Sequence, residues 1–245
     1  MPRLFTFGRD PDPDERPYWR QRGWQFSAGF LAVALFAGAI VVLLDVSDGN
    51  PTIAAAASVQ INAGPGQRPA GCGTDDSDQE APVRAPDDVT WRELNGAPVP
   101  FSRSQGPRVV DGGPLLWCFA HTPMGAVMAA NVIPRQMSGG SWATVVDQQV
   151  VAGRGRDIFV AMRSTVPDTT PQYSAGSLAG FLLVSYTPET ATVRVLIRSA
   201  QVVAATDYTV TWSGGDWKIQ PLPFGDLHSP LVPVSGMAGF IMWKV

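Results

Sequence analysis

The stretch YTVTWSGGDWKI, residues 208–219, decides the fold of this 245-residue chain. Its apolar residues alternate with threonines as far as Trp212, which is the period of a β-strand. Residues 213–216, SGGD, are typical of a turn, and the alternation resumes at Trp217. A loop of either two or four residues would place Trp212 opposite Trp217 on one face. The stretch therefore predicts a β-hairpin.

Two more strands are predicted immediately before this hairpin. Residues 178–186 are rich in apolar residues, and residues 187–190, TPET, are typical of a turn. Apolar and polar residues then alternate from Val193 to Arg198. Together with the hairpin, these segments predict an antiparallel meander.

The segment before the meander carries helix signals. Thr122, followed by proline, predicts a helix start with a capping hydroxyl, and Pro134 predicts the end or a kink of that helix. Ser141 predicts a second start with Gly153 as its stop, and Asp157 predicts the cap of a third, short helix. Helices followed by a meander predict an α+β domain in which the helices pack on one face of a curved antiparallel sheet.

The boundaries of this domain are predicted at residues 90 and 245. A short strand or turn is expected over Thr90–Leu94, where large apolar residues begin. Residues 221–245 are interpreted as proline-broken coil, with no place in the expected fold.

An apolar run without charges, Phe26–Leu44, predicts a transmembrane helix. Five arginines precede the run, whereas Asp45 and Asp48 are the first charges after it. Basic residues beside a span stay cytoplasmic, so residues 1–25 are expected inside and everything after Leu44 outside. The alternative is a cleaved signal peptide, with small residues at 54–57 as the cleavage site. We expect an uncleaved, single-pass protein of the cell membrane.

Residues 45–89 are predicted to be a disordered acidic linker. Residues 45–90 hold eight acidic residues against two arginines, and Pro and Gly are frequent among them. The acidic run 74–80 lacks the spacing and glycine of an EF-hand loop, so no calcium site is expected. Residues 91–245 hold nine acidic against eleven basic residues, and this balance argues against direct nucleic-acid binding.

Cys72 and Cys118 are the two cysteines of the chain. Both fall on the expected outer side, where disulfides form. A Cys72–Cys118 disulfide is the favoured interpretation. The alternative is a buried free thiol at Cys118 and an exposed one at Cys72.

No residue pattern predicts a catalytic, cofactor or metal site. His121 precedes a helix start, but the chain has no nucleophile elbow and no second histidine at metal spacing. Tyr186, Asp207 and Tyr208 are expected to line the concave face of the sheet. With His121, they are the candidate residues for a pocket.

The order of basic arm, single span, outer linker and α+β domain resembles the bitopic assembly subunits of type IV secretion and conjugation machines. Residues 72–79, CGTDDSDQ, and 119–126, FAHTPMGA, look like segments of uncharacterised actinobacterial membrane proteins found among mobile-element genes. The first resemblance implies an outer domain with the nuclear-transport-factor-two-like fold. It also implies scaffold work, with self-association and contacts to other channel proteins.

Two function hypotheses follow. The first is a membrane-anchored, non-enzymatic assembly subunit of a cell-envelope transfer apparatus, with the lipid bilayer and channel proteins as its partners. The second is an outward-facing enzyme or small-ligand binder that uses a cavity on the concave face of the sheet.

Overall fold

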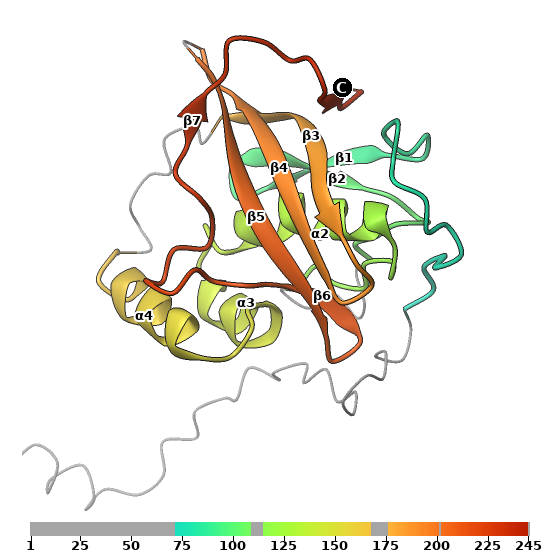
Figure 1. Ribbon diagram of the computed structural model, residues 1–245. Helices are drawn as coiled ribbons and strands as arrows, with labels where there is room; N and C mark the ends of the chain where they lie inside the picture. The colour runs from blue at the N-terminus through green and yellow to red at the C-terminus, as the bar shows by residue number, and fades with distance from the viewer. Residues whose placement is uncertain (1–71, 109–114, 168–175, 201, 245) are drawn as a thin grey trace, which may run out of the picture. The chain divides into compact units, whose positions relative to one another are not determined.

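The hairpin expected at residues 208–219 is present. Strand β5, Val203–Ser213, pairs antiparallel with β6, Asp216–Ile219, and Trp212 lies opposite Trp217. Gly214 and Gly215 form a two-residue turn with φ of 65° and 82°, the conformation of a type I′ turn. Of the two predicted loop lengths, two and four residues, the structure has the two-residue loop. The computed structural model describes residues 72–108, 115–167, 176–200 and 202–244 (Figure 1).

In the described residues, six strands form an antiparallel sheet with the order β6–β5–β4–β3–β8, and β7 also pairs with β5. The remaining strands are β3, Ser177–Tyr186; β4, Thr190–Arg198; β7, Val232–Pro233; and β8, Ile241–Met242. Two register shifts between β3 and β4 are irregularities of the kind that bend a strand. The predicted meander is confirmed as β3–β4–β5–β6.

The central helix is α2, Pro123–Gln136, which packs on the sheet (Figure 1). The hydroxyl of Thr122 accepts a hydrogen bond from the backbone N–H of Gly125 at 2.9 Å, so the predicted cap is confirmed. Eleven of the 14 residues of α2 are buried, because the helix contacts β3–β6 on one side and β2 on another. Pro134 lies in the last turn of the helix.

Two shorter helices follow, α3, Trp142–Gln149, and α4, Arg154–Arg163. The second start at Ser141 is confirmed, but Gly153 is not the stop of that helix. Gly153, with a φ of 142°, instead precedes α4 as its N-cap residue. Asp157, predicted as the cap of α4, lies in the first turn of this helix. A negative charge there interacts favourably with the helix dipole.

A separate two-stranded hairpin contains the strand predicted at Thr90–Leu94. This strand, β1, pairs antiparallel with β2, Ala97–Phe101, through the turn residues Asn95 and Gly96. Both turn residues have positive φ, 51° and 81°, as a two-residue turn requires. Strand β2 contacts both α2 and β3.

Residues 72–89 differ from the predicted linker, since they lie against the domain. Ala85 is only 3% exposed, and Asp75 donates its backbone N–H to the carbonyl of Ser104 at 3.0 Å. The Asp88 carboxylate accepts hydrogen bonds from the hydroxyl of Ser102 and the backbone N–H of Ser104. These partners are distant in sequence, so local composition could not reveal them.

The C-terminal tail also differs from the expected coil. It supplies β7 and β8, which pair with β5 and β3. Phe240 and Val234 pack against a small cluster of Ala179, Leu196 and Ala205 on the outer face of the sheet. The tail is therefore part of the sheet and of its cover.

The predicted arm 1–25, the predicted span Phe26–Leu44 and residues 45–71 of the predicted linker lie outside the described residues. Within the described ranges, no helix has the length and apolar character needed to cross a bilayer.

Candidate functional site

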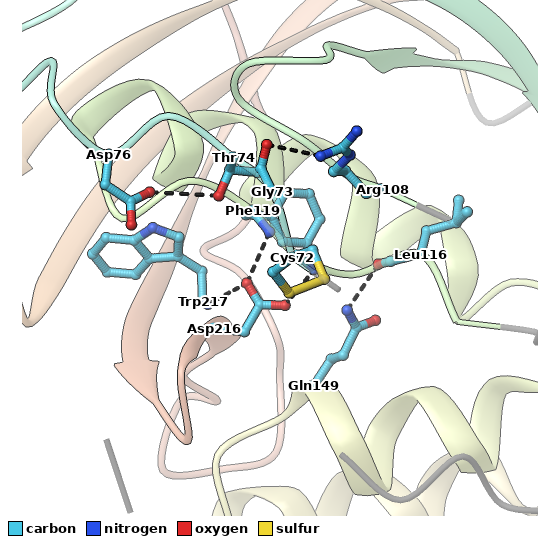
Figure 2. Close-up of a disulfide and its surroundings, with 11 residues drawn as sticks. Cys72, Gly73, Thr74, Asp76, Arg108, Leu116, Phe119, Gln149, Asp216 and Trp217 are labelled. Atoms are coloured by element: carbon cyan, nitrogen blue, oxygen red, sulfur yellow. Dashed lines mark hydrogen bonds between the residues drawn. A yellow bond between two sulfur atoms is a disulfide. The ribbon is translucent and has the colours of Figure 1, made fainter. Parts of the chain in front are cut away.

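A disulfide between Cys72 and Cys118 fixes residues 72–80, which we call the N-terminal strap, to the domain (Figure 2). The predicted pairing is confirmed, with a Cα–Cα distance of 5.2 Å. Arg108 adds a second attachment by donating to the carbonyl of Gly73 at 2.8 Å. The strap is thus held covalently and by hydrogen bonds.

The buried carboxylate of Asp216 organises the chain around this disulfide. Figure 2 shows Asp216 beside the disulfide, near Phe119 and Trp217. Its oxygens accept hydrogen bonds from the backbone N–H groups of Cys118, Phe119 and Trp217 at 2.8, 3.0 and 2.9 Å. Cys118 has a φ of 68°, which is uncommon for a residue with a side chain. The carboxylate holds this strained segment in place, a role that the turn motif SGGD did not reveal.

His121 lies in an aromatic cluster beneath the strap. Its ring stacks on Trp212 with the centroids 3.9 Å apart and an interplanar angle of 11°. Its Nε2 lies 2.7 Å from the carbonyl of Pro188 and therefore donates a hydrogen bond to that oxygen. The ring is packed and hydrogen-bonded.

Tyr186 lies near His121 and shares a partner with it. The Tyr186 hydroxyl donates to Oε1 of Gln79 at 2.9 Å, and Nε2 of Gln79 donates to the carbonyl of His121 at 2.8 Å. Burial raises the pKa of Tyr186, and Glu189 and Asp76 raise it further. The structure thus brings two of the four candidates together through the strap.

Asp207 lies on the outer face of the sheet, away from Tyr208. Its carboxylate accepts two hydrogen bonds from Arg194, at 2.7 and 2.9 Å. Neighbouring residues of a strand point to opposite faces, so the expectation that Asp207 and Tyr208 share one face is corrected here. The Asp207–Arg194 pair joins β4 to β5.

A cavity of about 270 Å³ lies between α2 and the inner face of the sheet. Most of its wall is apolar, and the wall comes from β3, β4, β5, α2 and the tail. The polar residues of the wall are Asn131, Arg135, Ser138, Thr206, Tyr208 and His228. Tyr208 is the one candidate of the four that lines it.

Burial shifts the pKa values of two side chains of this wall, Tyr208 and Arg135. Tyr208 is 8% exposed, and burial raises its pKa to about 12, although the Arg135 cation opposes the rise. Burial also lowers the pKa of Arg135. His228, which no sequence pattern indicated, donates from Nδ1 to the carbonyl of Ser229 at 2.7 Å. At neutral pH the cavity therefore presents a neutral phenol beside a guanidinium.

Tyr208 should ionise at a higher pH than Tyr186. Since its folded-state pKa lies above the ordinary value of 10.0, the associated stability is complete below pH 10 and is lost as the pH rises toward about 12. An ultraviolet titration of tyrosinate absorbance checks this, and Tyr208→Phe should remove the component near pH 12. A high-pH component that persists in Tyr208→Phe would contradict the assignment.

A second surface feature, the α4 patch, consists of exposed apolar side chains on α4 and the turn beside it. Gly225 adjoins Ile158 and Met162, so this turn lies directly against α4. Phe224, at the tip of the turn, is 82% exposed. The members of the patch are Met162, Val166, Leu222 and Phe224.

The described part of the chain contains no group of three or more histidine, cysteine, aspartate or glutamate residues that could hold a metal ion. Comparison with curated proteins and with solved structures gives no match. A family model with the description "Domain of unknown function (DUF8175)" matches residues 52–242, which is more than half of the chain. The chain therefore belongs to the DUF8175 family.

Proposed function

We propose that this protein is a membrane-anchored, non-enzymatic assembly subunit of a cell-envelope transfer apparatus of the conjugation type. In this proposal Phe26–Leu44 spans the cell membrane once and residues 1–25 are cytoplasmic. The outer domain binds channel proteins or a second copy of itself, and does not bind nucleic acid directly. The Cys72–Cys118 disulfide supports the outer location, because disulfides persist in oxidising compartments.

We further propose that the outer domain has the nuclear-transport-factor-two-like fold suggested by the resemblance. Three helices on an antiparallel sheet support this assignment. The register shifts in β3 are consistent with a curved sheet.

The α4 patch is the observation that carries the assembly role. Large exposed apolar side chains that lie together mark interaction sites, and Phe and Met are enriched in protein interfaces. Helix α4 has no fully buried residue, so its apolar side chains contribute little to the core. Their clustering beside Phe224 is therefore best explained by a partner protein.

The turn that presents Phe224 is ordered by its own hydrogen bonds. Leu222 donates its backbone N–H to the carbonyl of Asp226 at 2.7 Å, and Gly225 donates to the carbonyl of Leu222 at 3.0 Å. Gly225 has a φ of 94°, and a Cβ at this position would lie 2.6 Å from Cγ2 of Ile158. Because the backbone of this turn is already ordered, a partner that binds Phe224 does not have to order it.

The enzyme alternative needs His121, or Asp207 with Tyr208, to converge in one cavity. The structure places these residues in three locations: the aromatic cluster, the outer face and the cavity wall. This separation favours a binding role for the domain.

A photo-crosslinking amino acid at position 224 should give an adduct with a protein of the transfer apparatus, or with a second copy of the chain. Adducts from cells that carry the mobile element with its transfer genes are compared with adducts from cells that carry the gene of this protein alone. A crosslinker at Val184, which is exposed on β3 outside the patch, is the control. Equal adducts at the two positions, or none at position 224, would contradict the proposal.

A further inference from the structure

The cavity under α2 carries an arginine in a wall that is otherwise mostly apolar. The guanidinium of Arg135 donates a hydrogen bond to the carbonyl of Gly176, which also lines the cavity. No acidic side chain lines the cavity among the described residues. Burial lowers the pKa of Arg135, because a positive charge is less favourable away from water. An anion in the cavity would therefore stabilise this wall.

A second hydrogen-bond donor, the phenol of Tyr208, lies close to the guanidinium, because the Arg135 cation acts on its ionisation. A pKa of about 12 keeps the hydroxyl protonated at neutral pH. The hydroxyl makes no hydrogen bond to the described residues and is not fully enclosed by them, so a molecule in the cavity can reach it. The cavity thus offers a cationic donor and a neutral donor side by side.

The rest of the wall determines the body of a ligand. Leu178, Val195 and Ile197 from the sheet and Pro134 from α2 are apolar. The cavity volume of about 270 Å³ exceeds the roughly 150 Å³ of an engineered apolar cavity that binds benzene. One ring or a short branched chain therefore fits beside the two donors.

A carboxylate is the anion that matches these donors. It only accepts hydrogen bonds, and it pairs with a guanidinium through two parallel bonds. Its single negative charge balances one arginine, whereas a phosphate monoester carries about two charges at neutral pH. We propose that the cavity binds a small ionised carboxylic acid with an apolar body, and that Arg135 and Tyr208 hold its carboxylate. This site shares no residue with the α4 patch, so its test is independent of the assembly role.

Benzoate and benzamide are the matched probes, because they have nearly the same shape and differ in charge. Each is titrated into the full chain in a non-ionic detergent, with methyl labels on leucine, valine and isoleucine. Free probe concentrations are measured by dialysis, which corrects for partition into micelles. Benzoate should shift the methyl resonances of Leu178, Val195 and Ile197, and benzamide should bind at least about tenfold more weakly.

Arg135→Gln removes the charge and should weaken benzoate binding at least about tenfold, with little effect on benzamide. Arg92→Gln is the matched control, because it removes the same charge outside the cavity, where Cζ of Arg92 lies 4.4 Å from the ring centroid of Phe101. This variant should bind benzoate as the unaltered chain does. Tyr208→Phe removes one donor to an anion and should weaken benzoate binding about tenfold. A retained methyl spectrum shows that each variant is folded.

Three results would overturn the proposal. One is that benzoate leaves the cavity methyl groups unshifted. Another is that benzamide binds as tightly as benzoate, a comparison that needs no variant and does not depend on the folding of Arg135→Gln. The third is that Arg135→Gln and Arg92→Gln weaken benzoate binding equally, as a general effect of net charge would.

Discussion

Reduction of the Cys72–Cys118 disulfide should lower the free energy of unfolding of the outer domain by about 4 kcal/mol. The bond joins residues 46 positions apart, and in the chain-entropy model a loop of this length restricts the unfolded chain by about that amount. The folded state also depends on the bond, because it holds the N-terminal strap over the aromatic cluster of His121 and Trp212.

Denaturant unfolding of the full chain, followed by tryptophan fluorescence with and without reductant, measures this loss. A Cys72→Ser/Cys118→Ser double variant should show the same loss, and reductant should not change it further. Equal midpoints for the oxidised and reduced chains would contradict the prediction.

Asp216→Asn should destabilise the domain by about 3 kcal/mol while preserving the shape of the side chain. The carboxylate accepts from three backbone N–H groups, and the amide would place a donor against at least one of them. The lost bonds hold Cys118 in its positive-φ conformation. The loss of stability should therefore be large, although the substitution replaces only one side-chain oxygen by an NH₂ group.

Asp207→Asn is the matched control, with the same substitution on the outer face. The Asp207–Arg194 pair is partly exposed, and such pairs contribute about 1 kcal/mol or less. Denaturant midpoints of the two variants compare the sites directly. Equal losses at 216 and 207 would show that the buried carboxylate has no special role.

Local signals in the sequence were sufficient to predict the central elements of the fold. The glycine pair at 214–215 predicts a tight turn because both residues need positive φ. Thr122 followed by proline predicts a helix start because the hydroxyl pairs with a free N–H of the first turn. Alternation in β4 predicts its buried face, with Val193 and Val195 inside.

The parts of the fold that the sequence did not predict are held by partners far away in the sequence. Residues 74–80 are acidic and lack apolar periodicity, yet their strap is held by a disulfide and by bonds to residues of the domain. The tail pairs with β3 and β5 through strands of two residues, which are too short to show a pattern. Asp216 lies in a turn motif, and two of its three backbone partners, Cys118 and Phe119, are 98 and 97 positions away.

The candidate site was predicted in part. Tyr208 lines the cavity because it lies on the buried face of β5, as the alternation of that strand indicates. The same alternation places Asp207 on the other face, so this signal was available in the sequence. Asn131 gave no signal, because its place on the cavity wall depends on how α2 packs against the sheet.

Transfer frequency of the mobile element, measured after deletion of this gene, tests the assembly role most directly. The account predicts that transfer is lost on deletion and restored by the full chain. A Met162→Ser/Phe224→Ser variant that still folds should fail to restore it, whereas Val184→Ser should succeed. Unchanged transfer in the deletion strain, or full restoration by the patch variant, would contradict the account.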